Sequence, residues 1–149
     1  MPDPRTTLLA GLLSGGGGMV RTLFEFAMGW HNQHPEVGEK TGFVAIIFPV
    51  IAIVWALRRS RRAAGGQLTW RSAIAIGLGV SVISAAIGLA FFAAYYTIIN
   101  PGFVTAMQAR GVAVDVPSQL AAVGIGSLVG GMAITAVATL VMRKERQRP

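Results

Sequence analysis

The residues best suited to chemistry inside a membrane are Arg21 and Glu25, which lie in an otherwise largely apolar stretch. Positions i and i+4 of a helix share a face, so the two side chains can pair and turn away from lipid. Each charge costs about 2.5 to 3.5 kcal/mol at the centre of a spanning helix, and pairing offsets this cost. The pattern supports two interpretations, a structural ion pair or a polar site for an ion, a proton or a ligand head group.

Four polar residues follow this stretch and are of types that bind metals. His31, His34, Glu36 and Glu39 include zinc-binding side chains, but their spacing is not diagnostic of a zinc site. We therefore expect solvated loop residues, with no metal and no cofactor. The sequence contains no cysteine and no Walker-type, Rossmann, nucleophile-elbow or His-Glu-x-x-His motif. Nothing in it predicts an enzyme.

The elements that must position these residues are four long apolar stretches. A helix needs about 20 mostly apolar residues to cross a bilayer. The stretches cover about 6–30, 41–57, 72–99 and 118–142, with outer loops at 31–40 and 100–117 and a basic loop at 58–71. Only 13% of the residues are charged, against about 25% in soluble domains. We predict a single all-α domain, an integral membrane four-helix bundle.

Proline and glycine residues add local detail to this plan. Pro49 cannot bond the carbonyl four residues back, so the second span should kink near it. Pro35 is expected in the first turn of a helix. Residues 103–110 should form a short interfacial helix that ends at Gly111.

The basic residues are concentrated on one side of the apolar stretches, which holds ten of the thirteen lysines and arginines. Because Lys and Arg near span ends stay cytoplasmic, both termini and the 58–71 loop should be cytoplasmic. These residues lack the aromatic interleaving of an RNA-binding module, so anionic lipid is the expected contact and nucleic acid is not. The residues expected to contact anionic lipid are Arg58, Arg59, Arg61, Arg62, Arg143 and Lys144.

Glycine pairs at four-residue spacing occur in the first and last stretches. Gly11 with Gly15, and Gly126 with Gly130, place small residues where two helices can approach closely. A flexible hinge or a partner-binding groove is the alternative. The pattern does not distinguish contact with another span from contact with a second copy of the chain.

The segment Gly65-Gly66-Gln67-Leu68-Thr69-Trp70, together with the segment from Tyr95 through Asn100-Pro101-Gly102 to Phe103, resembles the DUF4199 family of small bacterial membrane proteins. Gly102 replaces an acidic residue of the family pattern, and Trp70 stands where Phe is usual. The resemblance covers nearly the whole chain. It implies four spans and a bacterial inner membrane, and it implies no mechanism.

From these patterns we predict a non-enzymatic inner-membrane protein that acts by interaction, as an accessory or assembly subunit and as a homo-oligomer. The alternative is a small ion or solute transporter or channel that uses Arg21 and Glu25. A third hypothesis is an enzyme with a metal held by the outer histidines. Short outer segments and the absence of obvious inverted repeats favour the first.

Overall fold

The computed structural model describes residues 3–31, 33, 34, 37 and 40–145, with only the backbone of residues 144 and 145. Within these residues the protein is all-helical and has no strand. The elements are α1 (Pro4–Ala27), the 3₁₀-helix η1 (Gly42–Ile46), α3 (Ile47–Ala63), α4 (Trp70–Ala94), the π-helix η2 (Tyr95–Ile99), α5 (Phe103–Ala109) and α6 (Val116–Glu145).

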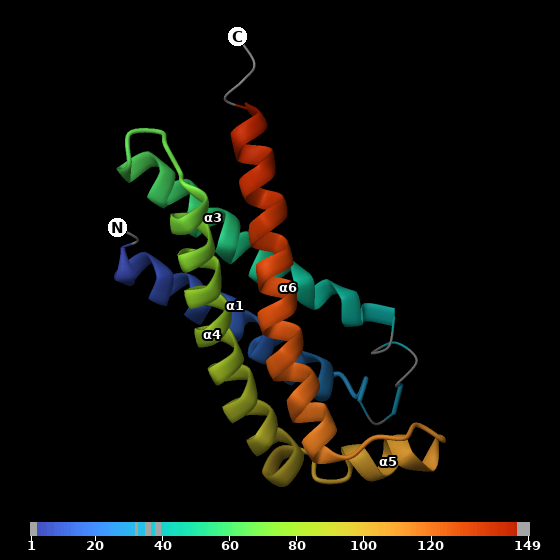
Figure 1. Ribbon diagram of the computed structural model, residues 1–149. Helices are drawn as coiled ribbons and strands as arrows, with labels where there is room; N and C mark the ends of the chain where they lie inside the picture. The colour runs from blue at the N-terminus through green and yellow to red at the C-terminus, as the bar shows by residue number, and fades with distance from the viewer. Residues whose placement is uncertain (1–2, 32, 35–36, 38–39, 146–149) are drawn as a thin grey trace.

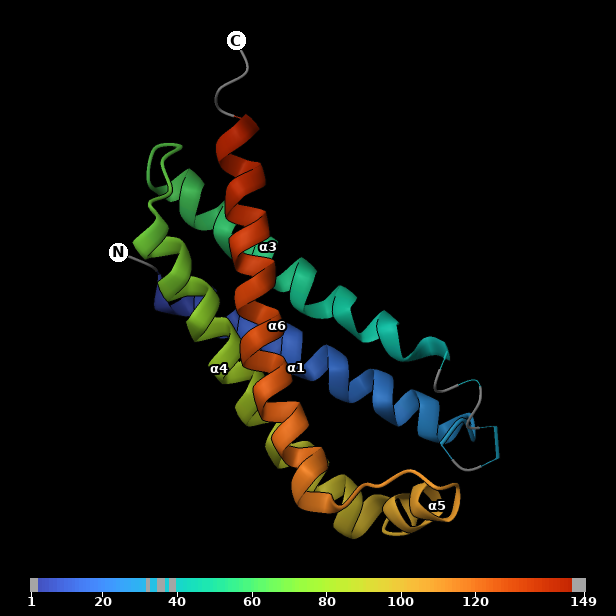
Figure 2. The ribbon, with the colours of Figure 1, turned by 45° about the vertical axis from the view of Figure 1, so that its right-hand side comes forward.

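The four long helices form two crossing pairs. The pair α4 and α6 crosses the pair α1 and α3 (Figures 1 and 2). The start of α1, the loop of residues 64–69 and the end of α6 lie toward one end, which we call the basic end; α5 lies at the other, which we call the α5 end (Figure 1). The pairs pack tightly near the basic end, where the apolar core lies. Its members are Ala10, Ala52, Ile53, Ala56, Leu57, Ala73, Ile76, Val80, Ala138 and Met142.

Local sequence explains where the helices begin. Asp3 caps α1 by accepting from the backbone N–H of Arg5 at 3.1 Å, and Thr69 caps α4 by accepting from the N–H of Ser72 at 3.2 Å. Pro49 has no N–H for the carbonyl of residue 45, and the chain is 3₁₀-helical over Gly42–Ile46 before regular α-helix follows. The change of helix type lies at Ile46 and Ile47, just before Pro49, and the kink expected near Pro49 stays a prediction. Pro35 lies outside the described residues.

The prediction of four spans needs a correction at α1. Among the described residues, three helices are long and apolar enough to span a membrane, namely Gly42–Ala63, Trp70–Ile99 and Val116–Arg143. The missing one is α1, whose 24 residues are long enough but include Arg21, Glu25 and a run of four glycines. After its first turn, the large apolar residues of α1 lie mostly outward and its polar residues are buried or partly buried: Leu9 and Val20 are exposed, whereas Ser14 and Glu25 are buried. Mean hydropathy hides this division because it averages the two faces.

Candidate functional site

Arg21 and Glu25 lie in the last two turns of α1 and form an ion pair at i,i+4 spacing. The Glu25 side chain is only 5% exposed and that of Arg21 15%. Nη2 of Arg21 donates to Oε1 of Glu25 and also to the backbone oxygen of Thr41, at 2.8 Å. The pair therefore joins the end of α1 to the segment that leads into α3.

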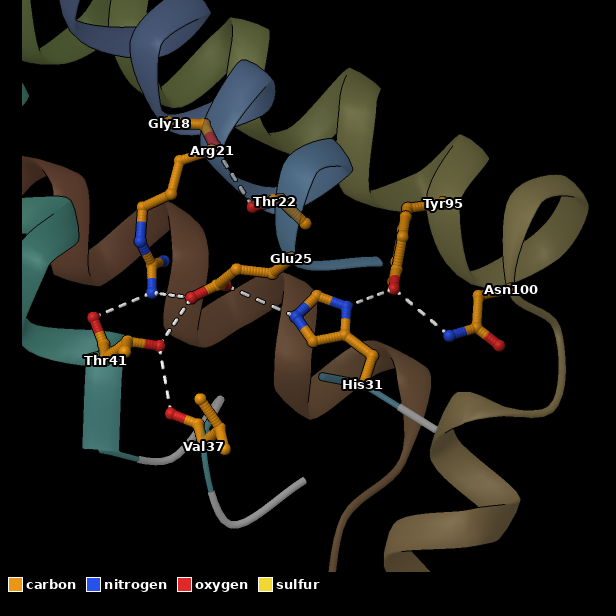
Figure 3. Close-up of polar contacts among 9 residues, drawn as sticks. All are labelled: Gly18, Arg21, Thr22, Glu25, His31, Val37, Thr41, Tyr95 and Asn100. Atoms are coloured by element: carbon orange, nitrogen blue, oxygen red, sulfur yellow. Dashed lines mark hydrogen bonds and ion pairs between the residues drawn. The ribbon is translucent and has the colours of Figure 1, made fainter. Parts of the chain in front are cut away.

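The Glu25 carboxylate has two further partners, drawn in Figure 3. The hydroxyl of Thr41 donates to Oε1 at 2.7 Å, and Nε2 of His31 lies 3.4 Å from Oε2. Among the described residues every buried side-chain nitrogen or oxygen has a hydrogen-bond partner. A charged carboxylate is tolerated away from water under this condition.

The network continues from His31 to the end of α4. Nδ1 of His31 is hydrogen-bonded to the hydroxyl of Tyr95, and Nδ2 of Asn100 donates to that hydroxyl at 3.1 Å (Figure 3). The π-helix makes this possible, since its i→i+5 bond from the N–H of Asn100 to the carbonyl of Tyr95, at 2.7 Å, brings the two residues together. A neutral His31 that donates from Nε2 and accepts at Nδ1 satisfies the whole chain from Asn100 through Tyr95 to Glu25.

His31 belongs to this network but lies outside the long helices, and its pKa is shifted. Burial lowers its pKa below the usual value, and the hydrogen bond to Glu25 only partly opposes this effect. Because the folded protein holds the proton less tightly than the unfolded chain, neutral His31 contributes stability that is present above the unfolded pKa of about 6.5. This contribution is lost as the pH falls through the lower folded pKa.

We therefore expect the melting temperature of the purified protein to fall on acidification below about pH 6.5. The variant His31→Gln should show a flatter profile over the same range. His34→Gln, which removes the other histidine, is the matched control and should keep the wild-type slope. A wild-type slope in His31→Gln would assign the acid sensitivity to another group.

A cavity of about 310 Å³ lies between the two helix pairs, next to Arg21. Its walls come from residues 14–22 of α1, 45–53 of η1 and α3, 80–92 of α4 and 123–134 of α6. Ile53 and Val80 belong both to these walls and to the apolar core, so the cavity adjoins the tightly packed basic end. Many of the residues that line it are small or carry a hydroxyl group, among them Gly15, Gly18, Ser84 and Ser127.

The two glycine pairs have different surroundings. A Cβ at Gly11 would lie 2.6 Å from Ile83, and one at Gly15 would lie 2.9 Å from Cβ of Ile87, so both glycines permit close packing of α1 on α4. A Cβ at Gly126 or Gly130 would meet no atom within 4 Å, and both line the cavity. Within one chain these two do not hold helices together, and their role between copies stays a prediction. Gly77 and Gly131 provide the close contacts between α4 and α6.

The basic residues expected to contact lipid lie at the basic end. The guanidinium groups of Arg59 and Arg143 lie 5.9 Å from the ring centres of Trp55 and Trp70. Arg61 donates from Nε to the carbonyl of Gly66 at 3.1 Å, whereas Arg58 and Arg62 are exposed. The side chain of Lys144 is outside the described part of the chain.

The described part of the chain contains no group of three or more His, Cys, Asp or Glu side chains that could hold a metal ion. Both ring nitrogens of His31 are engaged, one by Glu25 and one by Tyr95. Glu36 and Glu39 lie outside the described residues.

Sequence reasoning missed the roles of Thr41, Tyr95 and Asn100. Tyr95 is 64 residues from His31, and no periodicity connects such distant positions. The only local signal was the Tyr95-to-Asn100 segment before Pro101, whose five-residue spacing fits a π turn.

The comparisons with known proteins give one match. The family model described as protein of unknown function (DUF4199) matches residues 9–144. No curated protein and no solved structure matches the chain.

Proposed function

Because the chain belongs to the DUF4199 family, whose function is unknown, we propose a function from the site alone: a small membrane carrier or channel for an ion or small polar solute. The observation that carries the proposal is the cavity of about 310 Å³ beside a buried ion pair. Ligand sites in membrane bundles lie between helices, and ionisable residues inside them mark ion and substrate paths.

The nitrogens of Arg21 that have no hydrogen-bond partner within the described part of the chain indicate which kind of solute the cavity binds. Nη2 serves Glu25 and Thr41, and among the described residues Nε and Nη1 have no hydrogen-bond partner. No buried polar atom in this part of the chain is unsatisfied, so these nitrogens are accessible from outside the protein. Together with the hydroxyls of Ser84 and Ser127, they are suited to a small anion or a polar solute.

The membrane arrangement belongs to the same proposal. We place α1 in the bilayer as a fourth span, because its polar face is packed inside the bundle and its exposed residues are largely leucine, valine and phenylalanine. Both termini and the basic loop are then cytoplasmic in a bacterial inner membrane. The cavity, on the α5 side of the core, faces the outside.

A second candidate, an accessory or assembly subunit, is favoured by the completeness of the polar network. Glu25 has Arg21, Thr41 and His31 as partners, which is what a purely structural clamp between helices requires. Neither candidate is an enzyme. In this second reading the exposed face of α6 contacts another membrane protein or a second copy.

Labelling of single cysteines tests the cavity, because the wild-type chain has none. Methanethiosulfonate reagents react with thiolates in water, so a charged reagent should modify Ser127→Cys in the cavity. Val129→Cys is the matched control: it lies two positions away on α6, is 64% exposed and does not line the cavity. We expect at least about tenfold faster labelling of Ser127→Cys, since a lipid-facing thiol is not ionised. Labelling of Ser127→Cys that is as slow as that of a lipid-facing thiol would mean a dry cavity and would exclude the carrier proposal.

A further inference from the structure

Two grooves on the membrane-facing side of α3, near the basic end, are distinct from the cavity described above, and Ile134 is the one lining residue that they share with it. One groove, of about 410 Å³, runs between α3 and α6. A second, of about 440 Å³, lies along α3 beside Trp55. Both are lined by Val54 and Arg58. We propose that they form a binding site for one anionic phospholipid, with an acyl chain in each groove and the phosphate at Arg58.

The spacing of the lining residues suits an acyl chain. Val50, Val54 and Arg58 recur every four residues on one face of α3, and Val137 and Val141 recur likewise on α6. From Val50 to Arg58 the helix rises about 12 Å, enough for a substantial part of an acyl chain. The groove opens to the surface, since the Val137 side chain is 62% exposed. An alkyl chain placed there contacts valine side chains along its length.

The charges at the end of the grooves select the head group. Among the described residues, no hydrogen bond, ion pair or ring contact engages Arg58, whereas Arg59 stacks on Trp55 and Arg61 bonds the carbonyl of Gly66. Arg62 lies one turn beyond Arg58 and lines the second groove. Two exposed guanidinium groups, where the apolar lining ends, match a phosphate above two acyl chains. This site is independent of the carrier proposal and holds for either candidate function.

Quenching of Trp55 fluorescence measures acyl chains at the site directly. In a Trp30→Phe, Trp70→Phe background, Trp55 is the one tryptophan left, since the chain has three. The protein is reconstituted in phosphatidylcholine vesicles that contain a minor fraction of phosphatidylglycerol, and the bromine is carried on the acyl chains of either lipid. We expect brominated phosphatidylglycerol to show a several-fold higher relative affinity for the site. One basic residue contributes about fivefold.

Two matched pairs of variants separate a site from general attraction. Arg58→Gln should lose most of the preference, and Arg143→Gln, which removes the same charge from the same end, should keep it. Val137→Phe should fill the first groove and weaken binding without adding a tryptophan, whereas Leu140→Phe, at 58% exposure on α6 and outside both grooves, should not. Equal relative affinities of the two lipids for the unsubstituted site, after correction for their mole fractions, would overturn the proposal. Equal losses in Arg58→Gln and Arg143→Gln would also overturn it, because they would indicate surface charge alone.

Discussion

Replacing Gly11 and Gly15 together with leucine should lower the stability of the protein in detergent severely. A Cβ at either position already lies within 3.0 Å of an isoleucine of α4, so the larger side chain must force the helices apart. Overpacking of this kind costs about 1 to 3 kcal/mol per site. The measurement is thermal unfolding followed by tryptophan fluorescence, together with the elution volume on size-exclusion chromatography.

The matched control is the pair Gly126→Leu and Gly130→Leu, which has the same spacing and chemistry. Nothing lies within 4 Å of a Cβ at either position, so the leucines enter the cavity and the monomer should stay folded. Equal destabilisation by the two pairs would contradict the packing of α1 on α4 described above. If the control pair lowered only the oligomer size, Gly126 and Gly130 would lie between copies of the chain.

The contrast between the two glycine pairs shows how much of the helix packing the sequence alone predicts. Four-residue spacing is a property of one helix, and it is the same for both pairs. What each pair contacts depends on how α1, α4 and α6 cross, and this angle is fixed by side chains on all three helices. Sequence alone therefore predicts that a small-residue face exists without predicting its partner.

The same distinction applies to the polar site. The contact between Arg21 and Glu25 follows from helical periodicity alone, so it was predictable from residue numbers. The contacts of Glu25 with His31 and of His31 with Tyr95 depend on a turn and on a π-helix. Mean hydropathy identifies three helices as candidate spans. It does not identify α1, which we also expected to span, because Arg21, Glu25 and the glycine run lower its average.

A double-mutant cycle on Arg21 and Glu25 should show strong coupling in stability. Glu25→Gln keeps an oxygen for Thr41 but leaves Arg21 without its counter-charge, and Arg21→Met leaves the buried carboxylate without its cation. Breaking a buried pair from one side costs about 3 to 5 kcal/mol. The double variant, Arg21→Met with Glu25→Gln, removes both charges. It should recover most of the lost stability, because no unpaired charge remains.

Transport measured on the same four proteins then distinguishes the two candidate functions. Proton flux, reported by pyranine, and chloride flux are followed in proteoliposomes. If the cavity is a solute path and Arg21 holds the solute, the double variant should be stable but at least about tenfold slower than wild type, since each charge-assisted hydrogen bond contributes about 1.5 to 3 kcal/mol. Undiminished flux in the double variant would remove the pair from the path. Strong coupling with no flux in any of the four proteins, and no labelling of Ser127→Cys, would assign the network to a structural clamp and favour the accessory subunit, because a pair that only joins helices needs neither water nor a solute beside it.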